Sequence, residues 1–235
     1  MKLMVMGLIT LVVAQVFSLE CGVAQAADTK SSLIPAPAAQ YLMADRNEEI
    51  ALARSAAPGA ISGDADVLVL GAHGYETAVK GHNGFSCFVG RSWMLLYDDP
   101  EFLNPKVRLP ACLNPSGARW QLPLLFKATE LAVKRVPKSE MFDALASAYR
   151  DKELPLPEPG AMCYMMSKQQ YFGPKYKNAD PHLMFWFAQT GKIDWGANKP
   201  HVSVYMTQDA PDPVSTFVIP ALTWSDGSPN LVDGH

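Results

Sequence analysis

The sequence predicts an α+β fold: an antiparallel β-sheet, made of an N-terminal meander and C-terminal strands, with two or three helices in the middle. Three observations lead to this class. Short apolar or alternating segments occupy both ends of the chain, helical periodicity occupies its centre, and strict β-α-β alternation is absent. Of the 235 residues, 49% are hydrophobic and 18% are charged, which is enough apolar material for a sizeable core.

The N-terminal part predicts one helix and three strands. Asp45 followed by Glu48 has the spacing of a capping box, which predicts a helix over about residues 46–56. His82-Asn83-Gly84 is typical of a tight turn between strands. Apolar or alternating runs predict three strands that follow one another as a meander, over residues 67–70, 75–80 and 85–89.

The centre of the chain is predicted to be helical and its last third to be β. Asn114-Pro115 is a helix-start signal, and residues 139–152 carry the clearest amphipathic periodicity of the chain. Short apolar runs separated by Gly, Pro, Asp and Asn then favour an antiparallel sheet. The strands expected around and after the helices cover residues 106–113, 162–167, 183–188, 202–207 and 214–219.

The first residues have the features of a cleavable export signal. Lys2 is followed by an apolar run, and Ala24-Gln25-Ala26 has the small side chains of a cleavage site. We therefore expect an exported protein, periplasmic or secreted, with no run long enough to span a membrane after cleavage. The predicted organisation is a signal peptide over residues 1–26, a flexible lead-in over 27–44 and a single α+β domain over 45–235.

Signal cleavage removes Cys21 and leaves three cysteines, Cys87, Cys112 and Cys163. In an oxidising compartment three cysteines allow one disulfide and one spare thiol. We expect the disulfide to join Cys87 and Cys112, because this loop of about 26 residues stabilises the fold by roughly 3.5 kcal/mol in the chain-entropy model. The alternative is that all three cysteines are reduced and buried.

Charge and missing motifs exclude several classes of protein. A net charge of −3 gives no electrostatic reason to expect nucleic acid as a partner. The dinucleotide-binding fingerprint, the P-loop and the G-x-S-x-G, H-E-x-x-H and C-x-x-C motifs are absent from the sequence. We therefore expect no cofactor.

A long-range nucleophile acting with His182 is the enzyme alternative. A thiol from Cys87 or Cys163 close to His182 would have the chemistry of a hydrolase, with Asp180 to orient the imidazole. A hairpin of the strands that flank this region places Ser167 opposite His182, which supplies the residue types of a serine triad. For Ser167 and His182, the simpler interpretation is a hydrogen bond between the two strands.

A soft-metal site is a second alternative. Cys163, Met165 and His182 supply the thiol, thioether and imidazole that suit copper(I). Met162 and Met166 lie on the other face of the same predicted strand, so all the sulfur atoms of this run cannot converge. Methionines in apolar strands also serve as core filler. Zinc is not favoured, because the five histidines show no ligand spacing.

Aromatic side chains near C-terminal loops are candidates for a ligand cleft. Trp195, Tyr205 and Trp224 are the three residues that we single out. Tryptophan and tyrosine that line a cleft suit sugars or apolar ligands. The competing interpretation is that the aromatic residues of this region form the core.

Four stretches of the chain resemble an uncharacterised family of exported bacterial proteins that has no assigned activity. They are HNGFSCFVGRSW at residues 82–93, PGAMCYMMS at 159–167, PHLMF at 181–185 and WSDG at 224–227. The resemblance implies a bacterial, exported, single-domain protein and carries over no catalytic or binding residues. Our leading hypothesis is thus a module that binds a small molecule or a protein, with the hydrolase and the copper protein as alternatives.

Overall fold

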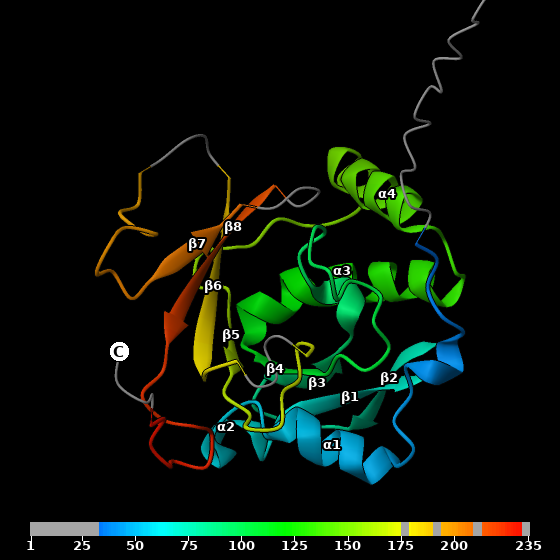
Figure 1. Ribbon diagram of the computed structural model, residues 1–235. Helices are drawn as coiled ribbons and strands as arrows, with labels where there is room; N and C mark the ends of the chain where they lie inside the picture. Colours follow the sequence, from blue (N-terminus) through cyan, green and yellow to red (C-terminus); the bar gives the residue numbers. More distant parts are fainter. Residues whose placement is uncertain (1–32, 175–178, 190–193, 209–212, 232–235) are drawn as a thin grey trace, which may run out of the picture. The chain divides into compact units, whose positions relative to one another are not determined.

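An eight-stranded, mostly antiparallel sheet with helices on its faces organises the protein, which confirms the predicted α+β class (Figure 1). The architecture comes from a computed structural model that describes residues 33–174, 179–189, 194–208 and 213–231, all within one compact unit of the chain. The predicted signal peptide and the first residues of the lead-in lie outside the described residues. No helix in the described part is long and apolar enough to cross a membrane.

The strands lie across the sheet in the order β2-β1-β3-β4-β5-β6-β8-β7, and β1 and β3 form its parallel pair. The strands are β1 (Asp66–Gly71), β2 (Gly74–Val79), β3 (Ser86–Gly90), β4 (Leu109–Leu113), β5 (Met162–Met165), β6 (His182–Ala188), β7 (Tyr205–Thr207) and β8 (Val214–Pro220). The helices are η1 (Ala38–Gln40), α1 (Arg46–Arg54), α2 (Gly59–Ser62), η2 (Ser92–Met94), α3 (Pro115–Val133) and α4 (Lys138–Arg150). The predicted helices and C-terminal strands are confirmed, with ends that differ by a few residues.

The predicted N-terminal meander is wrong in one connection. β1 and β2 form a hairpin, but β3 pairs in parallel with β1 instead of returning beside β2. The N–H of Gly81 donates to Asp66 Oδ1 (2.8 Å), and the N–H groups of the next two residues donate to the carbonyl oxygen of Asp64. A Cβ at Gly81 would lie 2.2 Å from that oxygen, so glycine permits the approach. The segment His82-Asn83-Gly84 therefore crosses the sheet beside the start of β1, and β3 then runs parallel to β1.

Helices cover both faces of the first half of the sheet (Figure 1). The alanine-rich side of α1, including Ala53, packs on one face against Cys87 and its neighbours. Leu125 of α3 and other side chains of α3 and α4 pack on the opposite face with Phe88. Asn114 caps the start of α3, and its side chain accepts the N–H of Gly117 (2.7 Å).

Residues 33–44 are packed onto the domain, in contrast to the flexible lead-in expected over 27–44. Tyr41 is buried, and its hydroxyl donates to the carbonyl oxygen of Leu103 (2.8 Å). Its ring meets the ring of Trp93 edge-on, with 4.8 Å between the centroids. One large side chain with a satisfied hydroxyl thus anchors a segment rich in alanine and proline.

A buried ion pair joins α1 to the sheet. Arg91 follows β3 and is fully buried, and its Nη2 lies 2.8 Å from Oε1 of the buried Glu49. Arg91 also donates to the carbonyl oxygens of Tyr41 and Val89. Glu49 Oε1 in turn accepts the N–H of Leu70 (3.1 Å). These bonds replace the water that both charges lose on burial.

A disulfide joins β3 to β4. Cys87 and Cys112 are directly opposite each other in this strand pair and are bonded, which confirms the expected pairing. Cys163 is buried and free. Because structural disulfides persist mainly in oxidising compartments, the bond is consistent with export.

Replacing Glu49 by Gln is expected to lower the free energy of unfolding by about 3–5 kcal/mol, because the Arg91 guanidinium then stays buried without its counter-charge. Urea unfolding followed by circular dichroism measures the loss. The control is Glu76→Gln, which breaks the exposed Arg46–Glu76 pair and should cost less than about 1 kcal/mol. Equal losses of unfolding free energy in the two variants would show that the buried pair stabilises the fold no more than the exposed pair does.

Reduction of the disulfide is expected to lower the free energy of unfolding by about 3.5 kcal/mol, since it opens a loop with a sequence separation of 25. Unfolding curves with and without a reductant measure the difference. The effect of the reductant should vanish in Cys112→Ala and persist in Cys163→Ala. A reductant effect that survives in Cys112→Ala contradicts the assignment.

Candidate functional site

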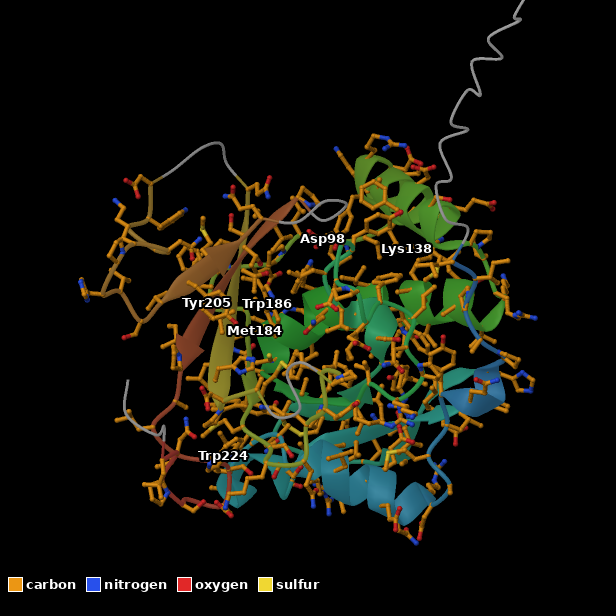
Figure 2. All side chains as sticks on the ribbon, in the orientation of Figure 1. Asp98, Lys138, Met184, Trp186, Tyr205 and Trp224 are labelled. Carbon is orange, nitrogen blue, oxygen red and sulfur yellow. A yellow bond between two sulfur atoms is a disulfide. The ribbon has the colours of Figure 1, made fainter. Side chains whose placement is uncertain are left out.

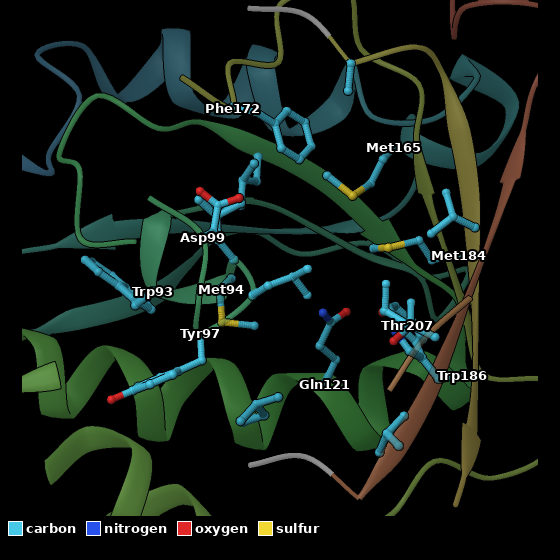
Figure 3. A pocket seen from close by; sticks show the side chains of 18 of the residues that line it. Trp93, Met94, Tyr97, Asp99, Gln121, Met165, Phe172, Met184, Trp186 and Thr207 are labelled. Carbon is cyan, nitrogen blue, oxygen red and sulfur yellow. The ribbon is translucent and has the colours of Figure 1, made fainter. Parts of the chain in front are cut away.

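A cavity of about 640 Å³ lies between α3 and the second half of the sheet (Figure 3). Strands β5 to β8 form one wall, α3 and α4 form another, and the segment 93–102 after β3 forms a third. The helix α3 packs mainly against β2 to β5, so the strands β6 to β8 extend beyond its cover. The space left between them is the candidate site.

The strand register decides which side chains face the cavity. Met165 lies opposite His182, and residues opposite each other in an antiparallel pair point to the same face. Because side chains alternate along a strand, Met184 and Trp186 share that face with His182. The same rule applies to the neighbouring strands β7 and β8. Their side chains on this face are those of Tyr205, Thr207, Val214, Thr216, Val218 and Pro220, and all of them line the cavity.

Most of the lining is apolar. Trp120 of α3 and Trp186 of β6 lie with their ring centroids 4.7 Å apart across one end of the cavity. Trp93 adds a third indole, from the segment after β3. The sulfur atoms around the cavity come from Met94, Met141, Met165 and Met184. This surface excludes water and favours apolar or polarisable partners.

Two polar atoms of α3 at the cavity are buried without a partner. Gln121 Oε1 and Trp120 Nε1 make no hydrogen bond within the described residues. Figure 3 shows the amide of Gln121 reaching into the cavity. Buried polar groups are normally paired, since an unpaired group costs about 1–3 kcal/mol. Trp120 and Gln121 both line the cavity, so a rotation of either side chain would bring its unpaired atom to a bound molecule.

The structure does not assemble the serine triad suggested by the sequence. The β5–β6 register is shifted by two residues from the expected one, so Met165 and not Ser167 lies opposite His182. The Ser167 hydroxyl is hydrogen-bonded to the hydroxyl of Ser55 (2.6 Å). His182 Nδ1 bonds the backbone carbonyl of Asp180 (2.7 Å), and burial lowers the pKa of this imidazole. The expected cross-strand bond between Ser167 and His182 is therefore wrong.

Neither cysteine candidate has the environment of a nucleophile. Cys87 is consumed by the disulfide, so it has no thiol to offer. Cys163 is buried, and desolvation raises the pKa of its thiol far above the ordinary value. The thiolate that a nucleophile or a metal ligand needs is strongly disfavoured there. Both side chains are structural.

The structure brings one of the three aromatic candidates to the cavity. Tyr205 of β7 lines it and is about half exposed, so it lies at the rim. Trp195 packs on Phe187 and Phe217, on the face of the sheet that points away from the cavity. Trp224 lies apart, in the turn after β8 (Figure 2).

Sequence reasoning missed most of the residues that build the cavity. Neither Trp120 nor Gln121 of α3 is among the candidate residues of the sequence. The signal in the sequence is weak, because α3 also carries Arg119, Lys127 and Glu130, so one glutamine beside a tryptophan does not stand out. No group of three His, Cys, Asp or Glu side chains that can hold a metal ion occurs in the described part of the chain.

The Cys163 thiol is expected to resist iodoacetamide in the folded protein and to react after unfolding, because its burial excludes the reagent and suppresses the thiolate. Mass spectrometry of the Cys163 peptide measures the modification. The control is Glu140→Cys, which places a thiol on the exposed side of α4 and should react in the folded state. Comparable labelling of the two thiols would restore Cys163 as a candidate nucleophile.

The chain matches no protein-family model, no curated protein and no solved structure. The function of the cavity is therefore argued from its own size, lining and polar atoms.

Proposed function

We propose that this protein is a binding module that holds a small, largely apolar organic molecule in the cavity between α3 and strands β5 to β8. The observation that carries the proposal is an apolar cavity lined by Gln121, whose Oε1 is buried without a hydrogen-bond partner in the described residues. A well-packed core leaves neither a space of this size nor an orphaned acceptor inside it.

The volume and the lining support a ligand of ordinary small-molecule size. About 640 Å³ lies within the roughly 300–1,000 Å³ range of small-molecule sites, which are mostly apolar with a few placed polar groups. The three indoles of Trp93, Trp120 and Trp186 favour flat or cyclic apolar groups. The methionines adapt to irregular shapes, because their side chains are unbranched and polarisable.

The polar atoms define what the ligand carries. Gln121 Oε1 accepts a hydrogen bond, so the ligand presents an N–H or O–H group to it. Trp120 Nε1 donates, so an oxygen or nitrogen acceptor completes the pairing. A hydroxyl, an amide or a protonated carboxyl group on an apolar body has this chemistry.

Binding is better supported than hydrolysis. The titratable side chains that line the cavity are those of Tyr97, Asp99, Asp180, His182 and Tyr205. Within the described residues no nucleophile is hydrogen-bonded to the His182 imidazole. Asp180 Oδ1 accepts from Asn230 (3.3 Å) and does not orient the ring. Export of the module to an oxidising compartment stays a prediction, with which the disulfide is consistent.

N-phenylnaphthylamine, an apolar fluorophore with one N–H group, is expected to bind to the cavity with one-to-one stoichiometry. Thr216→Phe directs a ring into the cavity from β8 and should weaken binding at least tenfold. Gln121→Leu removes the acceptor and should weaken it by about two- to tenfold, as expected for one hydrogen bond. Fluorescence titration measures both affinities.

Matched controls use the same substitutions outside the cavity. Thr77→Phe on the exposed side of β2 and Gln169→Leu in an exposed loop should bind the fluorophore like the original protein. Probe binding that is equally strong in Thr216→Phe and Thr77→Phe would place the probe elsewhere and refute the proposal.

A further inference from the structure

One wall of the cavity carries soft donor atoms from two neighbouring strands. In the β5–β6 pair Met165 lies opposite His182, and Met184 follows His182 by two residues. All three side chains therefore point to the same face, and all three line the cavity. The divergence expected from the sequence concerns the side chains of residues 162–166, which alternate along β5, whereas the second thioether on this face comes from Met184 of β6.

The spacing of the three residues suits a single small ion. Directly opposed residues of an antiparallel pair have Cβ atoms about 4.5–5.5 Å apart, and diagonal neighbours lie about 7–8 Å apart. Met165 and His182 form the direct pair, while Met165 and Met184 form a diagonal one. Figure 3 shows the side chains of Met165 and Met184 extending into the cavity from these strands. Unbranched methionine side chains span such separations by rotation about three bonds.

The hydrogen bond of His182 leaves its other ring nitrogen available. Nδ1 lies 2.7 Å from the backbone carbonyl oxygen of Asp180, and a carbonyl oxygen only accepts, so Nδ1 carries the proton. Nε2 then keeps its lone pair, and within the described residues it has no hydrogen-bond partner. A backbone carbonyl that holds one nitrogen of the ring is the usual outer partner of a histidine that binds metal through the other.

We propose that Met165 Sδ, Met184 Sδ and His182 Nε2 form a binding site for a soft monovalent metal ion, copper(I). Thioether and imidazole donors favour soft ions over zinc, magnesium or calcium. All three donors are neutral, so a monovalent ion leaves a single positive charge in the apolar wall, where a divalent ion would leave two. No oxidation or reduction is part of the proposal, since the ion binds as copper(I).

Cys163 is not a member of this site, which corrects the sequence-based ligand set. It lies opposite Met184 and on the same face, but it belongs to the packed core and does not line the cavity. The site therefore consists of two thioethers and one imidazole. It does not depend on organic ligands in the cavity and goes beyond the function proposed above.

The test is a competition for copper(I) between the purified protein and the chromogenic chelator bicinchoninate, with ascorbate present to keep the metal reduced. We expect the protein to withdraw one equivalent of copper(I) from the chelator complex. Met165→Leu and Met184→Leu should each weaken binding at least tenfold, and the double variant should abolish it. Leucine is close to methionine in volume, so these variants are expected to fold.

Three further variants make the test specific. Met141→Leu changes a cavity methionine outside the trio, and Met206→Leu changes a methionine on the other face of the sheet, so both should bind normally. Cys163→Ala should also bind normally. Silver(I), which resembles copper(I) and stays monovalent, should shift the methyl NMR signals of Met165 and Met184 and leave that of Met141 in place.

Three results would overturn the assignment. They are the absence of stoichiometric binding, an equal loss in Met141→Leu, and a loss in Cys163→Ala, which would indicate a thiolate site. Failure here is distinguishable from failure of the binding module. A protein that ignores copper(I) but binds N-phenylnaphthylamine in a manner sensitive to Thr216→Phe leaves the proposed function standing.

Discussion

The architecture depends first on the buried ion pair between Arg91 and Glu49, because two charges without water must keep every bond they make. The pair ties α1 to the end of β3 and to the carbonyl oxygen of Tyr41 in the N-terminal segment. Immediately after Arg91 the chain leaves the sheet and becomes the third wall of the cavity. Trp93 in this wall donates from Nε1 to Thr129 of α3 (3.1 Å). Leu103, just after the wall, accepts the Tyr41 hydroxyl (2.8 Å), so the wall is held at both ends. The buried ion pair thus fixes the point at which this wall of the cavity begins, although the pair itself lies outside the cavity.

The cavity arises because α3 and the sheet differ in extent. The helix α3 packs mainly on the strands of the first half of the sheet, and β6 to β8 extend the same face beyond it, so the cavity lies between them (Figure 1). The strand register determines which side chains lie opposite each other on this face. A shift of two residues in the β5–β6 pair keeps every side chain on its face but exchanges its partner. His182 thereby lies opposite Met165, which turns a suggested catalytic pair into part of an apolar, sulfur-rich wall.

Much of the local structure could be predicted, because its causes lie within a few residues. Asp45 and Asn114 accept backbone N–H groups at the starts of α1 and α3, where capping residues were expected. The amphipathic pattern of α4 and the C-terminal strands was also correct. The N-terminal meander was not, since the N–H groups after β2 find their acceptors at Asp64 and Asp66, far from the turn that they were expected to close.

The sequence by itself determined the α+β class, the helices and most strands, and it favoured the pairing of Cys87 with Cys112 that the structure confirms. Periodicity, capping and turn residues act over one or two turns of chain, so they can be recognised without a structure. Only the tertiary structure decided the side of β1 on which β3 lies, the register of β5 against β6, and the placing of Gln121 beside Met165 and His182 in one cavity. Those features depend on contacts between residues far apart in the chain, and such contacts leave no local pattern in the sequence.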